Sequence, residues 1–314
     1  MTQKAPGKAK REGINLLQLT QLFPDEAAAT KWFEACVWGK DGRYCPDCGS
    51  TDTKPCTHAE MPYRCSDCKK YFSVKKATVM RGSPIPLLKW LYAIYLDATS
   101  LKGVASMKLH RDLGVTQKTA WHMQQRIREA FADQGPPVLM EGPVEVDETY
   151  VGGKARNMHA AKRKQLTGRG GVDKTAVVAA KDRATKRVAA RVVDRPDQPT
   201  LQGFVVKHAD WQATIYTDSA SAYKGLPNHE AVSHSSGEYV RGEAGTQGVE
   251  SWFSMLKRAH KGTFHKLSPK HLQRYVNEFA GRHNIRELDT LHQMAYIARR
   301  LVGKRLSYAA LIAE

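Results

Sequence analysis

The sequence contains no long apolar run. No stretch approaches the roughly 18 consecutive apolar residues that a membrane-spanning helix needs, and the N-terminal MTQKAPGKAKREG has no apolar segment of the kind found in secretory signals. We therefore expect a cytoplasmic protein whose first residues form a flexible basic tail, and we expect no membrane partner.

Acidic residues are also scarce. The chain of 314 residues has 31 Asp and Glu against 49 Lys and Arg, which gives a formal net charge of +18. A basic surplus of this size is typical of proteins that bind a polyanion, and nucleic acid is the commonest one. An anionic membrane surface is the alternative, but the missing apolar segments argue against it.

Cysteines are few, and four of the six form two close pairs, CPDC and CSDC. The spacing Cys45-x2-Cys48-x16-Cys65-x2-Cys68 indicates a metal site rather than disulfides in a reducing compartment. Two such turns supply the four thiolates of a tetrahedral structural Zn²⁺ site with no open position for catalysis. Residues 41–76 have almost no aliphatic core, so the metal would hold this zinc ribbon together. An accidental set of buried cysteines is the alternative.

The two other cysteines have simpler interpretations. Cys36 lies in an apolar helical pattern and is expected to be a small core residue. Cys56 and His58 lie inside the ribbon loop, and we expect neither to be a ligand. The aromatic and basic residues around the second pair suit contact with phosphate, or else packing and dimerisation only.

The chain has one clear boundary, the Pro/Gly-containing segment DQGPPV at 133–138. Before it the expected elements are helices and the ribbon, whereas after it short Val-rich runs alternate with helical segments. We predict a basic tail and N-terminal helix at 1–40, a zinc ribbon at 41–80 and a helical domain at 84–135. An α/β domain is predicted at 140–290 and a C-terminal helical segment at 291–314.

Residues 106–131 have the pattern of a helix-turn-helix. Gly114 can end the first helix and Thr116 can cap the second. The second helix would then offer its polar side chains to the major groove of DNA, with Lys118 and Arg126 as contacts. The side chains expected to face solvent are Gln117, Lys118, His122, Gln125 and Arg126. The alternative is a plain three-helix bundle.

The second half predicts a mixed α/β fold. Val-rich runs at 144–151, 175–180 and 187–193 predict strands, as does ATIYTDS at 213–219, and 231–235 is a weaker candidate. Helices are expected over about 199–209, 246–260, 269–284 and 288–302.

Three acids in this half lie in unusual contexts. Asp147 lies within VEVDETYVGGK, Asp218 ends a strand, and Glu250 lies on an amphipathic helix. Strands disfavour acids, and a buried carboxylate needs a positive partner. Carboxylates that meet from these elements would bind Mg²⁺ or Mn²⁺, and two such ions stabilise both oxygens of a phosphodiester displacement. Taken singly, Asp218 is better explained as an N-cap of the following helix, and Glu250 as a solvated helix acid paired with Ser254 or Lys257.

The segments VDETYVGGK, IYTDSASAY, VESWFSMLKRAHKGTFH and HLQRYVNEFAGRHNIR follow the CxxC–CxxC ribbon in this order. Over about residues 20–290 the chain thereby resembles bacterial insertion-sequence DDE transposases of the zinc-ribbon, ISXO2-like group related to Merlin elements. The resemblance implies an RNase H-like catalytic domain, a central mixed five-stranded sheet flanked by helices. It also implies metal-dependent cutting at transposon ends and joining of the freed 3′-hydroxyl to target DNA.

The resemblance also implies residue roles. Asp147 and Asp218 match the first two acids of the family, Glu250 matches the third, and Lys257 matches a basic residue expected near the scissile phosphate. Many relatives have Asn three residues before the third acid, where this chain has Gln247. Because positions i and i+3 share a helix face, Gln247 remains an alternative ligand.

Further basic residues are candidates for DNA contact. Between residues 151 and 195 there are 13 Lys and Arg against 3 acids, and GGKARNMHAAKRKQLTGRGG predicts a mobile hairpin loop that becomes ordered on phosphate. A solvated charged loop is the alternative. His265 is expected to have a packing or solvent role rather than that of a proton shuttle. The candidates are Lys154, Lys162, Arg163, Lys164, Arg169, Arg258 and Lys261.

The leading hypothesis is a nucleoid-associated transposase that binds the terminal inverted repeats and target DNA as double-stranded DNA. By analogy with the family, it would act as a homodimer or a larger synaptic assembly. A zinc-ribbon transcriptional regulator without catalysis explains the ribbon and the charge, but gives the three acids no reason to converge. A metal-dependent nuclease without strand transfer fits the residues as well as a transposase does.

Overall fold

The computed structural model describes residues 3–4, 11–132, 138–153, 159–164, 174–218, 221–232 and 245–313, with the side chains of residues 3–4 and 162–163 left aside. The chain divides into two compact units, Met1–Asp133 with Ile285–Glu314 (unit 1) and Gln134–Asn284 (unit 2). No described helix is both long and apolar enough to cross a bilayer.

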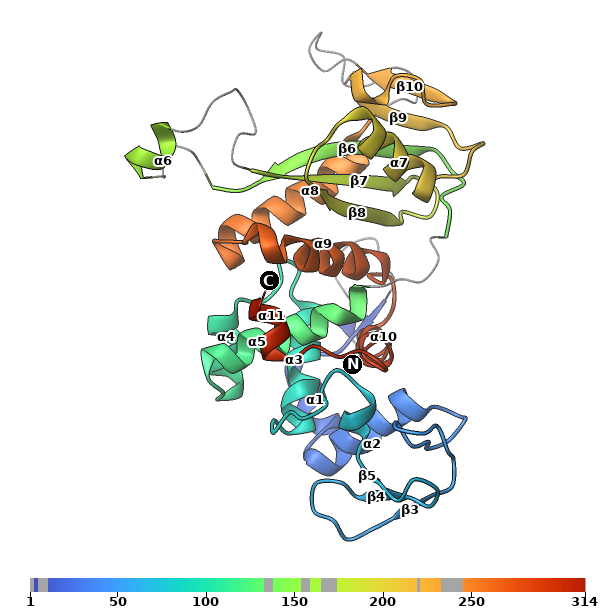
Figure 1. Ribbon diagram of the computed structural model, residues 1–314, viewed down its shortest axis with the longest axis vertical. Helices are drawn as coiled ribbons and strands as arrows, with labels where there is room; N and C mark the ends of the chain where they lie inside the picture. Colours follow the sequence, from blue (N-terminus) through green and yellow to red (C-terminus); the bar gives the residue numbers. More distant parts are fainter. Residues whose placement is uncertain are drawn as a thin grey trace. The chain divides into compact units, whose positions relative to one another are not determined.

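Unit 1 is mainly helical (Figure 1). Its strands are β1 (Gln3–Lys4), β2 (Glu12–Gly13), β3 (Thr53–Pro55), β4 (Tyr63–Cys65) and β5 (Tyr71–Phe72). Its helices are α1 (Leu16–Leu22), α2 (Glu26–Trp38), η1 (Val74–Ala77), α3 (Leu87–Thr99), α4 (Ser106–Leu113), α5 (Gln117–Arg128), η2 (Glu129–Phe131), α10 (Thr290–Arg300) and α11 (Tyr308–Ala313).

Helices α2, α3, α5 and α10 supply one buried apolar core. The N-terminus of α3 is fixed by a distant side chain, because the Glu26 carboxylate accepts hydrogen bonds from the backbone N–H groups of Leu87 at 2.6 Å and Leu88 at 2.8 Å. A carboxylate at this position satisfies free amide groups and the positive end of the helix dipole. Helix α10 returns to this core, so the chain from Ile285 onward belongs to unit 1, whereas the sequence placed a boundary at 290.

The segment that carries the cysteine pairs has its own small antiparallel sheet in the order β3-β4-β5. Trp38 from α2 packs edge-on against Tyr63 and Phe72 of this sheet. These two rings give the ribbon aromatic rather than aliphatic packing, as its composition requires.

Unit 2 contains β6 (Val144–Val151), β7 (Thr175–Asp182), β8 (Val188–Val193), β9 (Ile215–Asp218) and β10 (His229–Val232). Its helices are α6 (Ala160–Lys164), α7 (Gln198–His208), η4 (Ser221–Tyr223), α8 (Gln247–Ala259), the π-helical turn η6 (His260–Phe264) and α9 (Pro269–Asn284). The five predicted strands and three predicted helices of this unit are confirmed to within a few residues at their ends.

The five strands form one mixed sheet in the order β10-β9-β6-β7-β8 (Figure 1). Strands β6, β7 and β8 are antiparallel neighbours, while β9 runs parallel to β6 and β10 parallel to β9. Helix α7 packs on one face in a core with Val144 and Val146, and helices α8 and α9 pack on the other with Val151 and Val177. The predicted mixed five-stranded sheet flanked by helices is therefore confirmed.

Candidate catalytic and metal sites

The side chain of Asp147 belongs to the sheet face that α8 covers. Successive side chains of a strand point to opposite faces. Since Val144 and Val146 pack with α7, Glu145 and Asp147 must point toward the α8 side, as the burial of Val151 among α8 and α9 residues also requires.

The register of the sheet brings Asp218 beside Asp147. Strand β6 pairs in parallel with β9 through Val144 with Ile215 and Glu145 with Tyr216. The same register carried two residues further places Asp147 level with Asp218 on a neighbouring strand, and neighbouring strands lie about 4.8 Å apart. Both acids fall on the same face, because each lies two residues beyond a paired position.

The electrostatics of Asp147 show how closely the acids are grouped. Burial is the main reason that the pKa of the Asp147 carboxyl is raised to about 7. A hydrogen bond from the backbone N–H of Glu148 opposes this shift, and the negative charges of Glu148, Asp218 and Glu250 contribute to it. Asp218 and Glu250 therefore both lie close enough to Asp147 for their charges to act on it. A carboxylate in this environment ionises more readily when a cation is beside it.

Glu250 lies in the first turn of α8, and the hydroxyl of Thr246 donates a 2.8 Å hydrogen bond to its carboxylate. Its side chain is exposed, as is that of Gln247. Among the residues described, one group of three or more possible metal ligands has its ligand atoms within 4.8 Å of one another, and that group is the four cysteines. The acids are therefore neighbours rather than a closed ligand set.

The third acid of the β6 segment, Glu148, has a separate environment. The hydroxyl of Tyr223 donates a 2.8 Å hydrogen bond to its carboxylate. Burial raises the pKa of Glu148, although this hydrogen bond opposes the shift. Tyr223 is itself fully buried in the α7 core, so this pair anchors η4 to the sheet face opposite Asp147.

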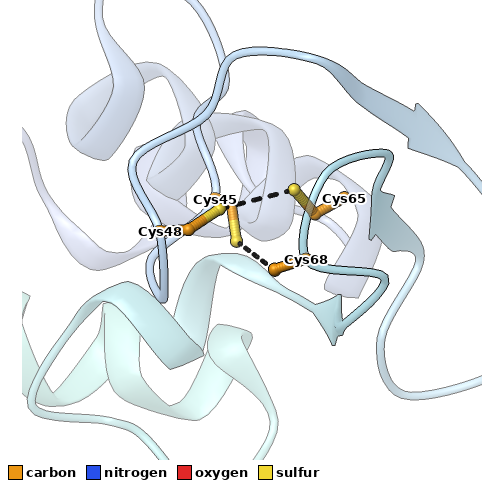
Figure 2. Close-up of side chains that lie close together, drawn as sticks. All are labelled: Cys45, Cys48, Cys65 and Cys68. Carbon is orange, nitrogen blue, oxygen red and sulfur yellow. Dashed lines mark hydrogen bonds between the residues drawn. The ribbon is translucent and has the colours of Figure 1, made fainter.

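The four paired cysteines converge as their spacing predicted (Figure 2). The Sγ atoms of Cys45 and Cys68 lie 3.6 Å apart, as do those of Cys48 and Cys65. A tetrahedral zinc with Zn–S bonds of about 2.3 Å requires sulfur separations of about 3.8 Å. The four thiols are therefore arranged to hold a metal ion.

The chemistry of the cysteines agrees with this arrangement. A hydrogen bond from the backbone N–H of Cys68 is the main reason that the pKa of Cys65 is lowered to about 7, which favours the thiolate that binds metal. Against a hydrogen bond from the backbone at Ser50, desolvation and the three neighbouring thiols raise the pKa of Cys48, so its proton would leave when a metal ion binds. Cys56 donates to the carbonyl of Met61 and is not in the four-cysteine group, and neither is His58. Cys36 is buried in the helical core, and burial raises its pKa to about 11.

The comparisons with known proteins agree with the motifs. Residues 139–284 match the ISXO2-like transposase domain. Over these residues the chain is similar to insertion-sequence transposases. A protein in transposable element ISH50 of Halobacterium salinarum is 28% identical over 283 residues, which cover 84% of this chain and 93% of that protein.

The matched transposase domain includes the three acids Asp147, Asp218 and Glu250. It also includes the basic residues after the first turns of α8 that are candidates for DNA contact. Lys257, Arg258 and Lys261 are exposed, and so is Lys164 of α6. His265 is exposed and adopts a left-handed backbone conformation with φ of 58°. The predicted contacts Lys154 and Arg169, and the side chains of Lys162 and Arg163, lie outside the described residues.

The helix-turn-helix candidate lies outside the matched transposase domain. Its turn is as predicted, with Gly114 in the left-handed conformation and Thr116 accepting from the N–H of Thr119. Gln125 is 0% exposed, so the prediction that it faces solvent is wrong. The C-terminal segment covers part of the same helix face, since Arg126 donates a 3.0 Å hydrogen bond to the carbonyl of Leu306.

Lys118, the other DNA contact predicted on α5, is exposed, and its ammonium group lies 4.3 Å from the ring centre of Tyr308. A cavity of about 390 Å³ lies between this part of α5 and the loop before α3. It is lined by Ile85, Trp90, Lys118, His122, Arg126 and Tyr308, among others. The buried residues Leu306 and Leu311 are the sequence feature that indicates that the C-terminal segment covers α5, and they lie far from α5 along the chain.

Proposed function

We propose that the chain is a DNA transposase whose unit 2 is an RNase H-like DDE domain that cuts and joins DNA with divalent metal ions. One observation carries the proposal. Asp147, Asp218 and Glu250 come from two strands and a helix, yet the second and third both act electrostatically on the first. The mixed sheet and the match of residues 139–284 to a transposase domain support the same conclusion.

The chemistry of these donors suits Mg²⁺ or Mn²⁺. Carboxylate oxygens are the ligands that these hard cations prefer, and Asp147 is held where ionisation is unfavourable without a cation. A bound pair of ions would polarise the scissile phosphate and lower the pKa of the attacking water or 3′-hydroxyl. Asp147, Asp218 and Glu250 would hold the ions, with Gln247 as the alternative to Glu250.

The protein's own role beyond ligation is to bind and orient DNA. Lys257 lies two helical turns after Glu250 on α8, so the two share a face and Lys257 would contact a phosphate near the reacting one. Arg258 and Lys261 would extend this contact, and the basic residues between 151 and 195 would add phosphate contacts. Binding would then weaken steeply as salt rises.

Unit 1 would bind the terminal inverted repeats. Zinc held by Cys45, Cys48, Cys65 and Cys68 would be structural, because all four positions around the ion are taken by sulfur. Helix α5 would contact the major groove through Lys118, and Arg126 would join it only by releasing Leu306. Two ends must be joined, so a homodimer or larger assembly is expected.

The purified full chain, incubated with labelled DNA that carries the element's terminal inverted repeats, should cut at the repeat ends only when Mg²⁺ or Mn²⁺ is present. A second substrate with a pre-cut 3′-hydroxyl end should become covalently joined to a target plasmid. Joined products support the transposase, and cutting without joining would favour the nuclease. Repeat binding without either reaction at any metal concentration would favour the regulator.

A further inference from the structure

A buried acid two residues before Asp147 connects the elements that carry the three proposed metal ligands. Glu145 is 5% exposed. One of its carboxylate oxygens accepts a 2.6 Å hydrogen bond from Nε of Arg183, and the other accepts a 2.9 Å hydrogen bond from the backbone N–H of Val249. Val249 directly precedes Glu250, so the carboxylate on β6 fixes the first turn of α8.

Arg183 extends the same connection to two further places. Its Nη2 donates a 2.8 Å hydrogen bond to the carbonyl of Gly245, just before α8 begins. Its guanidinium carbon lies 4.5 Å from the ring centre of Tyr216, which is two residues before Asp218 on β9. One guanidinium group therefore contacts β6, β9 and the start of α8, the three elements that carry Asp147, Asp218 and Glu250.

The start of α8 approaches β6 so closely that a side chain at one of its positions would displace the carboxylate of Glu145. A Cβ atom on Gly248 would lie 2.6 Å from Oε2 of Glu145 and 3.1 Å from Oε1. From the neighbouring strand β7, Nζ of Lys181 donates a 2.9 Å hydrogen bond to the carbonyl of Gly248. The helix end is thus held from both sides, by an acceptor for its N–H and a donor for its carbonyl.

The electrostatics favour this arrangement. The negative carboxylate of Glu145 lies at the positive N-terminal end of α8, where it satisfies an amide group and the helix dipole together. Its own burial is balanced by the charge of Arg183 in a close ion pair. Because both of its oxygens are already bonded to the protein, Glu145 is suited to hold structure rather than to bind a metal ion.

We propose that Glu145, Arg183 and Gly248 are positioning residues for the divalent-metal site. They set the separation of Glu250 from Asp147 and Asp218, and through it the affinity for the ions. The proposal rests on the proposed function, in which these three acids are the ligands. It adds residues that do not touch substrate but fix where the ligands stand.

The test is Mn²⁺ binding to the full chain, measured by electron paramagnetic resonance, with thermal melting measured in parallel. Gly248→Ala would force the Glu145 carboxylate and the start of α8 apart, with loss of the hydrogen bond to Val249, and should weaken Mn²⁺ binding about tenfold or more, the range seen when groups that orient metal ligands are lost. Gly203→Ala is the matched control, because Gly203 lies in α7 of the same unit and a Cβ there would contact nothing within 4 Å. It should bind Mn²⁺ as the wild type does.

Arg183→Lys provides a second, independent variant. Lysine keeps the charge, but its single ammonium cannot bond Glu145 and Gly245 while stacking on Tyr216. It should also weaken Mn²⁺ binding about tenfold at a temperature where the melt shows the chain folded, and it decides the question if Gly248→Ala does not fold.

Asp147→Asn distinguishes failure of the positioning role from failure of the proposed function, in which the three acids are the metal ligands. If it abolishes Mn²⁺ binding while the folded Gly248→Ala and Arg183→Lys chains bind Mn²⁺ with wild-type affinity, the positioning role is overturned and the proposed function survives. A lower melting temperature with unchanged Mn²⁺ affinity also overturns it, since that is the result of a merely structural role. If Asp147→Asn leaves Mn²⁺ binding intact, both proposals fail.

Discussion

Replacing Asp147 by asparagine should reduce metal-dependent DNA cutting by more than about a hundredfold. Removing a group that merely orients a metal ligand costs up to about a hundredfold, and the loss of a ligand itself should cost more. The amide keeps the shape of the side chain but carries no negative charge for Mg²⁺ or Mn²⁺. DNA binding should remain, because it rests on basic residues elsewhere. Gel-shift and cleavage assays on the same preparation measure both. Glu230→Gln, at an exposed acid of β10, is the control and should cut normally.

The same substitution should stabilise the metal-free protein. In the folded chain the Asp147 carboxyl keeps its proton up to about pH 7. In the unfolded chain the carboxyl loses its proton near its ordinary pKa of 3.8. Between these values the folded state binds more protons, so wild-type stability falls as the pH rises, and the loss is complete above about pH 7. Asparagine does not ionise, and the variant should exceed the wild type by up to about 4 kcal/mol at pH 8.

Urea unfolding in the presence of a chelator, at pH 4 and at pH 8, measures this difference. The variant and the wild type should have similar free energies of unfolding at pH 4 and differ at pH 8. Equal stability at both values would mean that Asp147 is not held in the environment described. A residue that lowers stability and is required for activity has the profile of a functional rather than a structural group.

Replacing Cys65 by serine should remove zinc from the ribbon and unfold residues 41–76. Zinc binding in small metal domains supplies about 10–16 kcal/mol of folding free energy, and this segment has little apolar core to replace it. Elemental analysis after dialysis should fall from one zinc per chain to almost none. Amide hydrogen exchange should show loss of protection over β3, β4 and β5.

Cys56→Ser is the matched control for the ribbon. Cys56 lies in the same segment, but its thiol bonds to the carbonyl of Met61 and does not join the four sulfur atoms. This variant should keep one zinc per chain. Full zinc retention by Cys65→Ser, or equal zinc loss by both variants, would contradict a four-cysteine site.

The strands of unit 2 are predictable from sequence because local chemistry defines them. The Val-rich run 144–151 ends at Gly152-Gly153, and the run of β8 is followed by Pro196. The cysteine group is predictable for the same reason. Each CxxC turn places two thiols on one side by local geometry, so a single contact between the two turns completes the group. The positions of Asp147, Asp218 and Glu250 on their elements could also be predicted from the motifs.

What sequence alone does not provide is contact between distant segments. Glu145 reads as one acid among three in VEVDETYVGGK, and its role appears only when the sheet register and the start of α8 are known. Gln125 was expected at the surface because its own helix pattern is polar there. Its burial depends on tertiary packing that the pattern of one helix does not contain.

The central claim is that Asp147, Asp218 and Glu250 hold divalent ions against a DNA phosphate. Anomalous X-ray scattering from Mn²⁺ in crystals of the full chain with a transposon-end duplex tests it most directly. We expect two manganese peaks bonded to carboxylate oxygens of these residues and to the scissile phosphate. Manganese bound elsewhere, with these three side chains more than about 10 Å from any ion, would contradict the account, since carboxylate–metal bonds of this class are about 2 Å long.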